Sequence, residues 1–302
     1  MDKKQILKEL MKHGIAPTPD ELNNISRENL SNFLDMKKHD QTDEVSTNIR
    51  ILKNNGDKTL NSRDFIKKFN EKYETLRDIL LKKTDAISIN KARKIFAESV
   101  VVVRVKDIAR EGFVVEDTTG EAEVVSKEDG IEIGDVIAIE GTFRDNRMFP
   151  EKIIFPDIPL SNHRDPVDGI DIKFTDKITG SFSGIVISTQ AEPPENPENI
   201  TNIPNPAWLE ITSGEKKLVI LAFRTGNEIT GKDAENILKK RMLPKTNNMD
   251  MNNAISYVPD VFWISGNREN WNRNYKGVVI VSTGNSYATY NTTTNKIIFG
   301  NL

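Results

Sequence analysis

The sequence predicts an α+β protein of several domains, because helical and strand-type hydrophobic patterns occupy separate parts of the chain. Apolar side chains recur at helical spacing in residues 1–38 and 61–83. From residue 95 onward the apolar residues instead form short β-branched runs separated by turn residues. The 302 residues are enough for two modest domains with extensions.

Composition excludes several classes of protein. The chain has no cysteine, which excludes disulfides, thiolate zinc sites and a cysteine nucleophile. A net charge of −3 is not that of a nucleic-acid-binding polycation. No stretch reaches the roughly 18 apolar residues that span a bilayer, and the charged residues 1–17 contain no apolar signal-peptide core. We therefore expect a cytoplasmic protein that does not bind membranes.

The N-terminal 94 residues are predicted to be mainly helical. Residues 1–38 form a helical module that Pro17 and Pro19 interrupt. A weakly ordered cap and a docking module for a partner are both open interpretations of this module. The polar residues 39–60 are interpreted as a linker. Residues 61–94 contain a lead-in helix whose aromatic and aliphatic stripe is expected to pack against the next domain.

Residues 95–160 are predicted to form a five-stranded β-barrel of the OB type. The runs VVVVRVKDI, GFVVEDTTG, EAEVV, DVIAIEGTF and KIIFPDI have the length and spacing of its strands. Residues 97–155 contain 7 Lys or Arg against 14 Asp or Glu, and an acidic surface repels phosphates. Protein docking is therefore the expected role. Four aromatic residues are interpreted as core rather than as base-stacking platforms, namely Phe113, Phe143, Phe149 and Phe155.

Residues 161–302 are predicted to form an α/β domain. The runs KLVILAF, DVFWIS and GVVIVS are apolar throughout, as expected for strands that are buried on both faces. Residues 232–242 form the clearest helix of this part.

Several segments resemble, in order and spacing, the small subunit of the archaeal D-family DNA polymerase (DNA polymerase II). The first are NSRDFIKKFNEKYETLRDILLKK, VVVVRVKDI and IIFPDIPL; the later ones are QAEPPENP, NPAWLEI, VPDVFWISGN and YKGVVIVSTGN. The resemblance implies an OB domain followed by a shortened calcineurin-like phosphoesterase domain. It also implies the large catalytic subunit as partner, DNA contact through that complex, and contact with a sliding clamp. Family members use two divalent metals, Mn or Mg, for 3′–5′ exonuclease activity.

The positions that correspond to the family's metal site hold other residues here. In chain order they are Asp176, Ile178, Gly184, Val186, Arg224, Asn267 and Glu269. Asp176 keeps the family's aspartate, whereas Ile178, Arg224 and Asn267 stand where the family has histidines. A two-metal centre needs converging imidazoles and carboxylates, and no histidine follows His163. We therefore expect a degenerate exonuclease site without a bound cofactor.

Asp176 and Glu269 are the two carboxylates left at these positions. They are the weak candidates for a single loosely bound Mg²⁺ or Mn²⁺. The favoured interpretation is a strand-end turn residue for Asp176 and a solvated loop charge for Glu269.

The aromatic and basic residues around Asn267 and Glu269, two of the positions that correspond to the family's metal site, predict a partner interface. They are Trp263, Arg268, Trp271, Arg273 and Tyr275, and these residue types most often anchor partners. A solvated face with buried aromatic residues and a residual contact with the DNA backbone are the alternatives.

Three functions follow from these observations. The favoured one is an accessory polymerase subunit that scaffolds the large subunit and has lost its exonuclease activity. The alternatives are an active metal-dependent 3′–5′ exonuclease with an atypical site and an OB-fold protein that binds single-stranded DNA.

Overall fold

The computed structural model describes residues 48–54, 62–95, 97–160, 167, 169–176, 182, 184–189, 200–244 and 253–301. The described part is mostly β-sheet and includes a closed five-stranded barrel. Apart from Asn48 and the turn 213–215, its residues belong to one compact unit, Ile49–Thr212 with Lys216–Leu302. The predicted helical module 1–38 lies outside the described residues. Part of the predicted linker forms a strand, β1 (Asn48–Asn54).

Helix α4 (Ser62–Leu81) confirms the predicted lead-in helix. Of the described side chains on its apolar stripe, Tyr73, Leu76 and Leu80 are buried in one cluster with barrel residues such as Val102. The hydroxyl of Tyr73 donates a hydrogen bond to the carbonyl of Val102 over 3.2 Å. Burial raises the pKa of Tyr73 to about 12, and the Asp117 carboxylate adds to the shift. The short helix α5 (Ile89–Ala92) follows.

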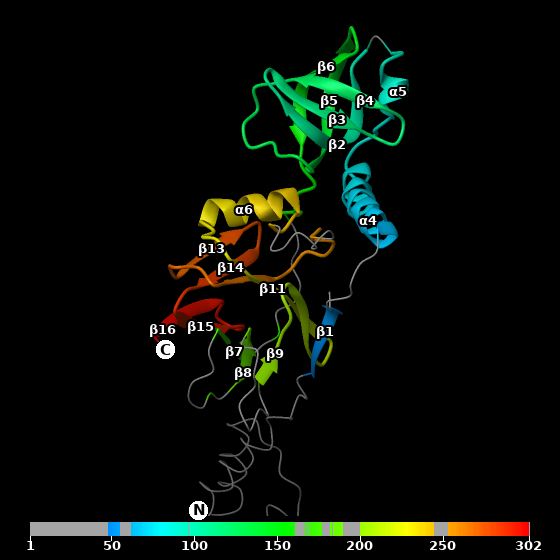
Figure 1. Ribbon diagram of the computed structural model, residues 1–302. Coiled ribbons are helices and arrows are strands. Elements are labelled where there is room, and N and C mark those ends of the chain that lie inside the picture. Colours follow the sequence, from blue (N-terminus) through cyan, green and yellow to red (C-terminus); the bar gives the residue numbers. More distant parts are fainter. Residues whose placement is uncertain are drawn as a thin grey trace, which may run out of the picture. The chain divides into compact units, whose positions relative to one another are not determined.

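The barrel closes in the order β2-β3-β4-β6-β5, which is compatible with an OB-type barrel (Figure 1). Its strands are β2 (Ser99–Ala109), β3 (Gly112–Glu116), β4 (Glu121–Val125), β5 (Val136–Arg144) and β6 (Arg147–Ile154). Alternate side chains fill its interior, among them Val103, Phe113 and Ile139. Phe149 is an exception to the predicted core, because 39% of it is exposed.

Two sheets make up the C-terminal part. The six-stranded sheet has the order β1-β10-β11-β12-β14-β13, and the five-stranded sheet has the order β16-β15-β7-β8-β9. The strands of the first, β1 aside, are β10 (Ala207–Ser213), β11 (Lys216–Arg224), β12 (Val261–Ser265), β13 (Trp271–Tyr275) and β14 (Val278–Thr283). Those of the second are β7 (Asp171–Thr175), β8 (Ile185–Ser188), β9 (Ile200–Asn202), β15 (Ser286–Asn291) and β16 (Lys296–Asn301). Strands β11, β12 and β14 are parallel, as are β7, β8 and β9.

Strand β12 is buried on both faces, as its uninterrupted apolar run predicts. Trp263 lies in a cluster that joins the two sheets, with its ring centroid 5.2 Å from that of Phe174 on β7. Phe262 and Ile264 point to the other face, into a cluster that includes Ile237 of helix α6 (Gly231–Lys240). The predicted helix is thus confirmed, and it covers one face of the six-stranded sheet (Figure 1).

Helix α6 begins where its sequence provides a capping box. The side chain of Thr230 accepts a hydrogen bond from the backbone N–H of Asp233, and the Asp233 carboxylate accepts one from the backbone N–H of Thr230. The helix ends at Arg241, which adopts a left-handed conformation with φ of 50°. None of the helices in the described part of the chain combines the length and the apolar character that crossing a membrane would need.

Candidate functional site

The candidate site lies where the parallel strands β11, β12 and β14 end. Arg224, Ser265 and Thr283 are the last residues of these strands, and they are aligned with one another across the sheet. Sheets of this kind place ligands beyond the carboxyl ends of their strands. We call the segments that follow, 224–229, 265–270 and 282–286, the carboxyl edge.

Asn267 braces the carboxyl edge from within. Its amide oxygen accepts a hydrogen bond from the backbone N–H of Ile229 over 2.9 Å. Its amide nitrogen donates to the carbonyl of Ile229 over 2.9 Å and to the hydroxyl of Ser282 over 2.7 Å. The Ser282 hydroxyl in turn donates to the carbonyl of Glu269 over 3.2 Å. Asn267 is buried, and both of its amide hydrogens are used, one on the backbone of the loop after β11 and the other on the Ser282 side chain of β14.

Gly266 lets these loops approach each other closely. It has φ of +82°, and a Cβ atom at this position would lie 2.7 Å from the carbonyl oxygen of Thr225. The backbone N–H of Thr225 donates to the carbonyl of Ser265 over 2.9 Å. The end of β11 and the loop after β12 are therefore fixed to each other by backbone contact as well as by Asn267.

The charged residues of the carboxyl edge point to solvent. Arg224 and Glu269 are exposed. The side chain of Arg268 is 87% exposed and lies 3.9 Å from the carboxylate of Glu228. An exposed pair at this distance contributes little to stability, so Arg268 is available to other anions.

Asp176 lies in the other sheet, immediately after β7. Its carboxylate accepts a hydrogen bond from the hydroxyl of Thr189 over 2.8 Å. Ile178 lies outside the described residues. Within the described ranges, no group of three or more Asp, Glu or His side chains is arranged to hold a metal ion.

The structure corrects the assignment of Gly184 and Val186 to the metal site. Strands β7 and β8 are parallel, with Thr175 aligned with Ser188 at their carboxyl ends. Gly184 precedes β8 and lies beside Asp171 at the opposite edge, where an added Cβ would be 2.5 Å from the Asp171 carbonyl oxygen. Val186 is buried within β8. Because Asp176 follows the carboxyl end of β7, neither residue can share a site with it.

The donor set of the carboxyl edge does not fit a two-metal centre. Arg224 brings a positive charge to a position that would have to bind a cation. The amide of Asn267 is already engaged on both of its polar atoms. Such a centre needs several imidazoles and carboxylates around both ions, and this edge has only the exposed carboxylates of residues such as Glu228 and Glu269.

The structure also corrects the predicted partner interface. Trp263 has no exposed surface, and its indole N–H donates to the hydroxyl of Thr283 over 2.9 Å. It therefore cannot contact a partner. Trp271 and Tyr275 are half-buried and pack against the cluster beneath α6. Arg273 is exposed and pairs with Glu235 of α6 over 2.7 Å. Of the residues in the predicted interface, Arg268 and Arg273 are therefore the exposed ones.

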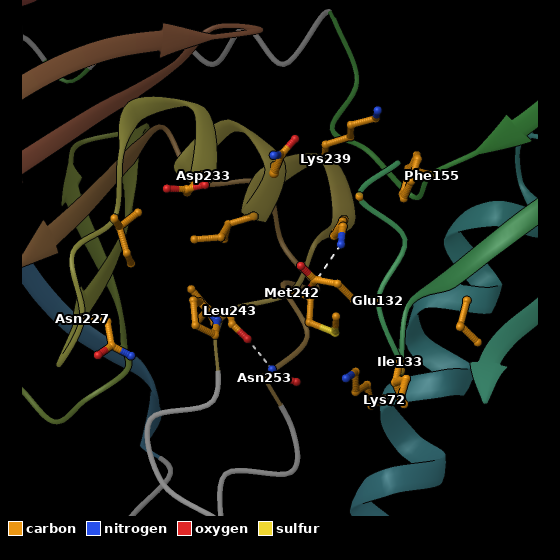
Figure 2. Close-up of a pocket in the computed structure, with 18 of the residues that line it drawn as sticks. Lys72, Glu132, Ile133, Phe155, Asn227, Asp233, Lys239, Met242, Leu243 and Asn253 are labelled. Atoms are coloured by element: carbon orange, nitrogen blue, oxygen red, sulfur yellow. Dashed lines mark hydrogen bonds and ion pairs between the residues drawn. The ribbon is translucent and has the colours of Figure 1, made fainter. Parts of the chain in front are cut away.

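A cavity of about 950 Å³ lies between α6 and the loop before β5. Figure 2 shows Lys72 and Ile133 on one side and Asn227 and Asp233 on the other. Phe155 lines it too, with the ammonium group of Lys239 4.4 Å from its ring centroid. Sequence reasoning missed the cavity, because its walls come from segments far apart in the chain. Two of its lining residues, Lys239 and Lys240, are adjacent basic residues in the last turn of α6.

Lys240 connects α6 to the loop that lines the cavity. Its ammonium group lies 2.9 Å from the carboxylate of Asp135 and 3.2 Å from that of Glu132. Asp135 is 1% exposed, and one of its carboxylate oxygens has no hydrogen-bond partner. Burial raises the pKa of Asp135 above its ordinary value, although Lys240 and the backbone N–H of Glu132 act in the opposite direction.

A scan of the sequence against models of protein families found no match. A search of curated proteins found no significant similarity to this chain.

Proposed function

We propose that this protein is a non-catalytic accessory subunit that scaffolds the large catalytic subunit of a D-family replicative DNA polymerase. The resemblance of its segments to the small subunit of that polymerase is the basis of the proposal. The order of elements supports it: a lead-in helix packs on a closed barrel of OB-compatible topology, and two sheets with parallel strands follow. We infer that these two sheets correspond to a shortened phosphoesterase domain.

The main support for the proposed loss of catalysis is the environment of Asn267. By the resemblance, a metal-binding histidine belongs there. Instead, a buried amide joins the loops after β11 and β12 to β14 through three hydrogen bonds. The Asn267 side chain therefore stabilises the fold of this sheet. A scaffolding subunit needs that fold but does not need the metal site.

Two surfaces support a docking role. The cavity between α6 and the barrel loop has apolar walls, including Ile133 and Phe155, with charged groups around them. Arg268 and Arg273 lie exposed near one end of the six-stranded sheet. Arginine and aromatic groups of this kind are the usual anchors of protein partners.

The proposal is tested by co-expression with the large subunit encoded in the same genome. We expect the two chains to co-elute in size-exclusion chromatography and to remain associated on dilution. The chain purified alone is the control for self-association. Failure of the two chains to associate at micromolar concentrations would overturn the scaffold role.

A nuclease assay separates this function from that of an active exonuclease. The isolated chain and the complex are incubated with a 3′-labelled single strand and Mn²⁺. We expect no cleavage above that of Asp176→Ala and Glu269→Ala, which serve as matched controls. Cleavage that requires Mn²⁺ and is abolished by Asp176→Ala would establish an active, histidine-free site instead.

A further inference from the structure

The cavity beside α6 has the size of a small-molecule site. Its volume of about 950 Å³ lies at the upper end of the range of about 300–1,000 Å³ that such sites occupy. One wall is the face of α6 that carries Lys232, Asn236 and Lys239, and the loop around Ile133 forms another. That loop connects the third and fourth strands of the barrel. It is therefore not one of the loops with which OB-type barrels hold nucleic acid, those after the first and fourth strands.

Apolar side chains in this cavity are exposed enough for a ligand to cover them. Ile133 is 61% exposed and Met242 is half-buried. Behind them, Phe155 and Leu243 are buried in two different core clusters. The backbone of this wall is fixed, because the N–H of Leu243 donates to the carbonyl of Asn253 over 2.9 Å and the Asn253 amide donates back to the Leu243 carbonyl. A ligand that covers Ile133 and Met242 removes apolar surface from water without first having to order the wall.

Two ammonium groups on α6 are not neutralised by a carboxylate. Lys232 is exposed and forms no hydrogen bond or ion pair with a described residue. Lys239 is half-buried, with its ammonium group beside the ring of Phe155 (Figure 2). No carboxylate of the described residues pairs with it. The acidic side chains of the helix are engaged elsewhere, Asp233 in the capping box and Glu235 with an arginine of β13.

Most other charged side chains of the cavity are paired with one another. Arg104 pairs with Glu116, and the ammonium group of Lys240 lies 3.2 Å from the carboxylate of Glu132. Asp129 is exposed on the barrel side and has no cation beside it in the described part of the chain. The remaining charged residues of the lining are Lys72, Lys106 and Glu228. Positive charge without a partner is therefore found on the α6 wall, which favours an anionic group there.

We propose that this cavity binds a small amphipathic anion, with its apolar rings on Ile133 and Met242 and its anionic group at Lys239. The ligand class is an aromatic ring system that carries a sulfonate, phosphate or carboxylate group. Burial of the rings supplies the affinity, and a few charged groups of one sign fix the orientation. Lys232 lies seven residues before Lys239, about 10 Å along the helix, and adds to the positive potential. The inference is independent of the proposed function, because the site needs no partner chain.

The test uses two fluorescent probes with the full-length chain. Anilinonaphthalene sulfonate combines aromatic rings with one sulfonate group, and phenylnaphthylamine has the same rings without the sulfonate. We expect one molecule of the sulfonate probe to bind per chain with a Kd of about 10⁻⁵–10⁻⁴ M, the affinity that a ligand of its size reaches. Raising the salt concentration should weaken binding of the sulfonate probe and leave that of the uncharged probe unchanged.

Two substitutions separate the charge from the apolar wall. Lys239→Ala should weaken binding of the sulfonate probe about fivefold, because a charge contact is lost, and should not affect the uncharged probe. Ile133→Ala should weaken binding of both probes about fivefold, because apolar contact area is lost. Neither side chain is buried, so thermal unfolding of both variants should stay close to that of the wild type.

Lys296→Ala and Ile298→Ala are the matched controls. Both residues are exposed, and they belong to β16, which does not line the cavity. The two substitutions remove the same kinds of side chain from another surface, so the affinity for either probe should not change.

Three results would overturn the inference. One is the absence of a saturable increase in fluorescence up to about 10⁻⁴ M probe. Another is binding that Ile133→Ala and Lys239→Ala leave intact, or that the β16 controls weaken equally, since the probe would then lie on another surface. The third is equal weakening of both probes by Lys239→Ala, which would leave nothing to select an anion. Co-elution with the large subunit is measured separately, so failure here leaves the proposed function standing.

Discussion

Asp157 and Lys276 form an ion pair with 2.5 Å between the carboxylate and the ammonium nitrogen. The same carboxylate accepts a hydrogen bond from the hydroxyl of Tyr275 over 3.1 Å. The carbonyl of Asp157 accepts from Lys83 over 3.0 Å and from Arg241 over 3.1 Å. One residue after the barrel thus contacts the segment after α4, the end of α6 and the β13–β14 turn. Asp157 also lies within IIFPDIPL, a segment that carries the resemblance.

Replacing the Asp157 side chain should remove the contacts of its carboxylate with Lys276 and Tyr275, whereas the backbone carbonyl can still accept from Lys83 and Arg241. We expect Asp157→Ala to lower the free energy of unfolding by about 2–3 kcal/mol, the contribution typical of hydrogen bonds to a charged group. Part of the loss has a second cause, because Asp157 has φ of +33°, a conformation that alanine tolerates less well than aspartate. Urea-induced unfolding followed by tryptophan fluorescence measures the change.

Asp157→Asn is the matched control for the charge. Asparagine tolerates the same backbone conformation and still accepts from Tyr275, but it loses the attraction to Lys276. The loss should be intermediate, and the pKa of Tyr275, which burial and then the Asp157 carboxylate raise, should fall. Unfolding energies of both variants within about 0.5 kcal/mol of the wild type would show that Asp157 does not hold these segments together.

Asn267 gives a prediction with a pH dependence of known sign. In Asn267→Asp the introduced carboxylate can accept from the backbone N–H of Ile229, but it cannot donate to the Ile229 carbonyl or to Ser282. We expect a loss of about 2–4 kcal/mol near neutral pH, from unpaired buried groups. Burial raises the pKa of the introduced carboxyl, so its protonated form, which can donate once, is favoured in the folded state. The loss should therefore shrink as pH falls.

Asn267→Ala separates this effect from simple truncation. It removes the same hydrogen bonds without adding a titrating group, so its loss of stability should not change with pH beyond that of the wild type. Thermal unfolding at several pH values measures both variants. Parallel pH profiles for the two would contradict the assigned role of the Asn267 amide.

Gly266 and Gly277 form a matched pair for testing the packing of the carboxyl edge. Both have positive φ, +82° and +89°, but only Gly266 has a backbone oxygen in the way of a Cβ, that of Thr225 at 2.7 Å. Gly277→Ala should cost about 1–2 kcal/mol, the conformational penalty alone. Gly266→Ala should cost more, because the loop must also move. If chemical denaturation gave equal losses of unfolding free energy for the two variants, the close approach of the Thr225 carbonyl to Gly266 would not contribute to stability.

The elements were largely predictable because local signals and tertiary packing agree in them. The helical stripe around Tyr73 predicted α4, and the capping residues Thr230 and Asp233 are visible in the sequence before α6. The uninterrupted run around Phe262 predicted a strand buried on both faces. The same run indicates that Trp263 is buried, whereas Trp271 begins a mostly polar strand, WNRNY, at the edge of the sheet.

The parts of the site that were mispredicted depend on strand direction and phase. A local match at Gly184 cannot show which end of a strand it occupies, and the parallel register puts it at the edge away from Asp176. Phe149 was counted as core because of its residue type. Its neighbour Met148 has the inward phase instead, and alternation then turns Phe149 outward.

Asp135 and Lys240 provide a pH test of a buried ion pair. Burial raises the pKa of Asp135 above its ordinary value of 3.8 in spite of the nearby ammonium group. The folded protein therefore binds this proton more tightly than the unfolded chain does. The contribution is fully present below pH 3.8 and is lost as pH rises through the folded-state pKa.

Asp135→Asn removes the titration, so the unfolding free energy of the wild type relative to this variant should fall as pH rises above 3.8. Lys240→Met removes the attraction that opposes the shift, so the pKa of Asp135 should be higher in this variant. The fall of its unfolding free energy with pH should therefore extend to higher pH than in the wild type. A difference that instead rises with pH would mean that the ion pair outweighs burial and that the pKa of Asp135 is lowered.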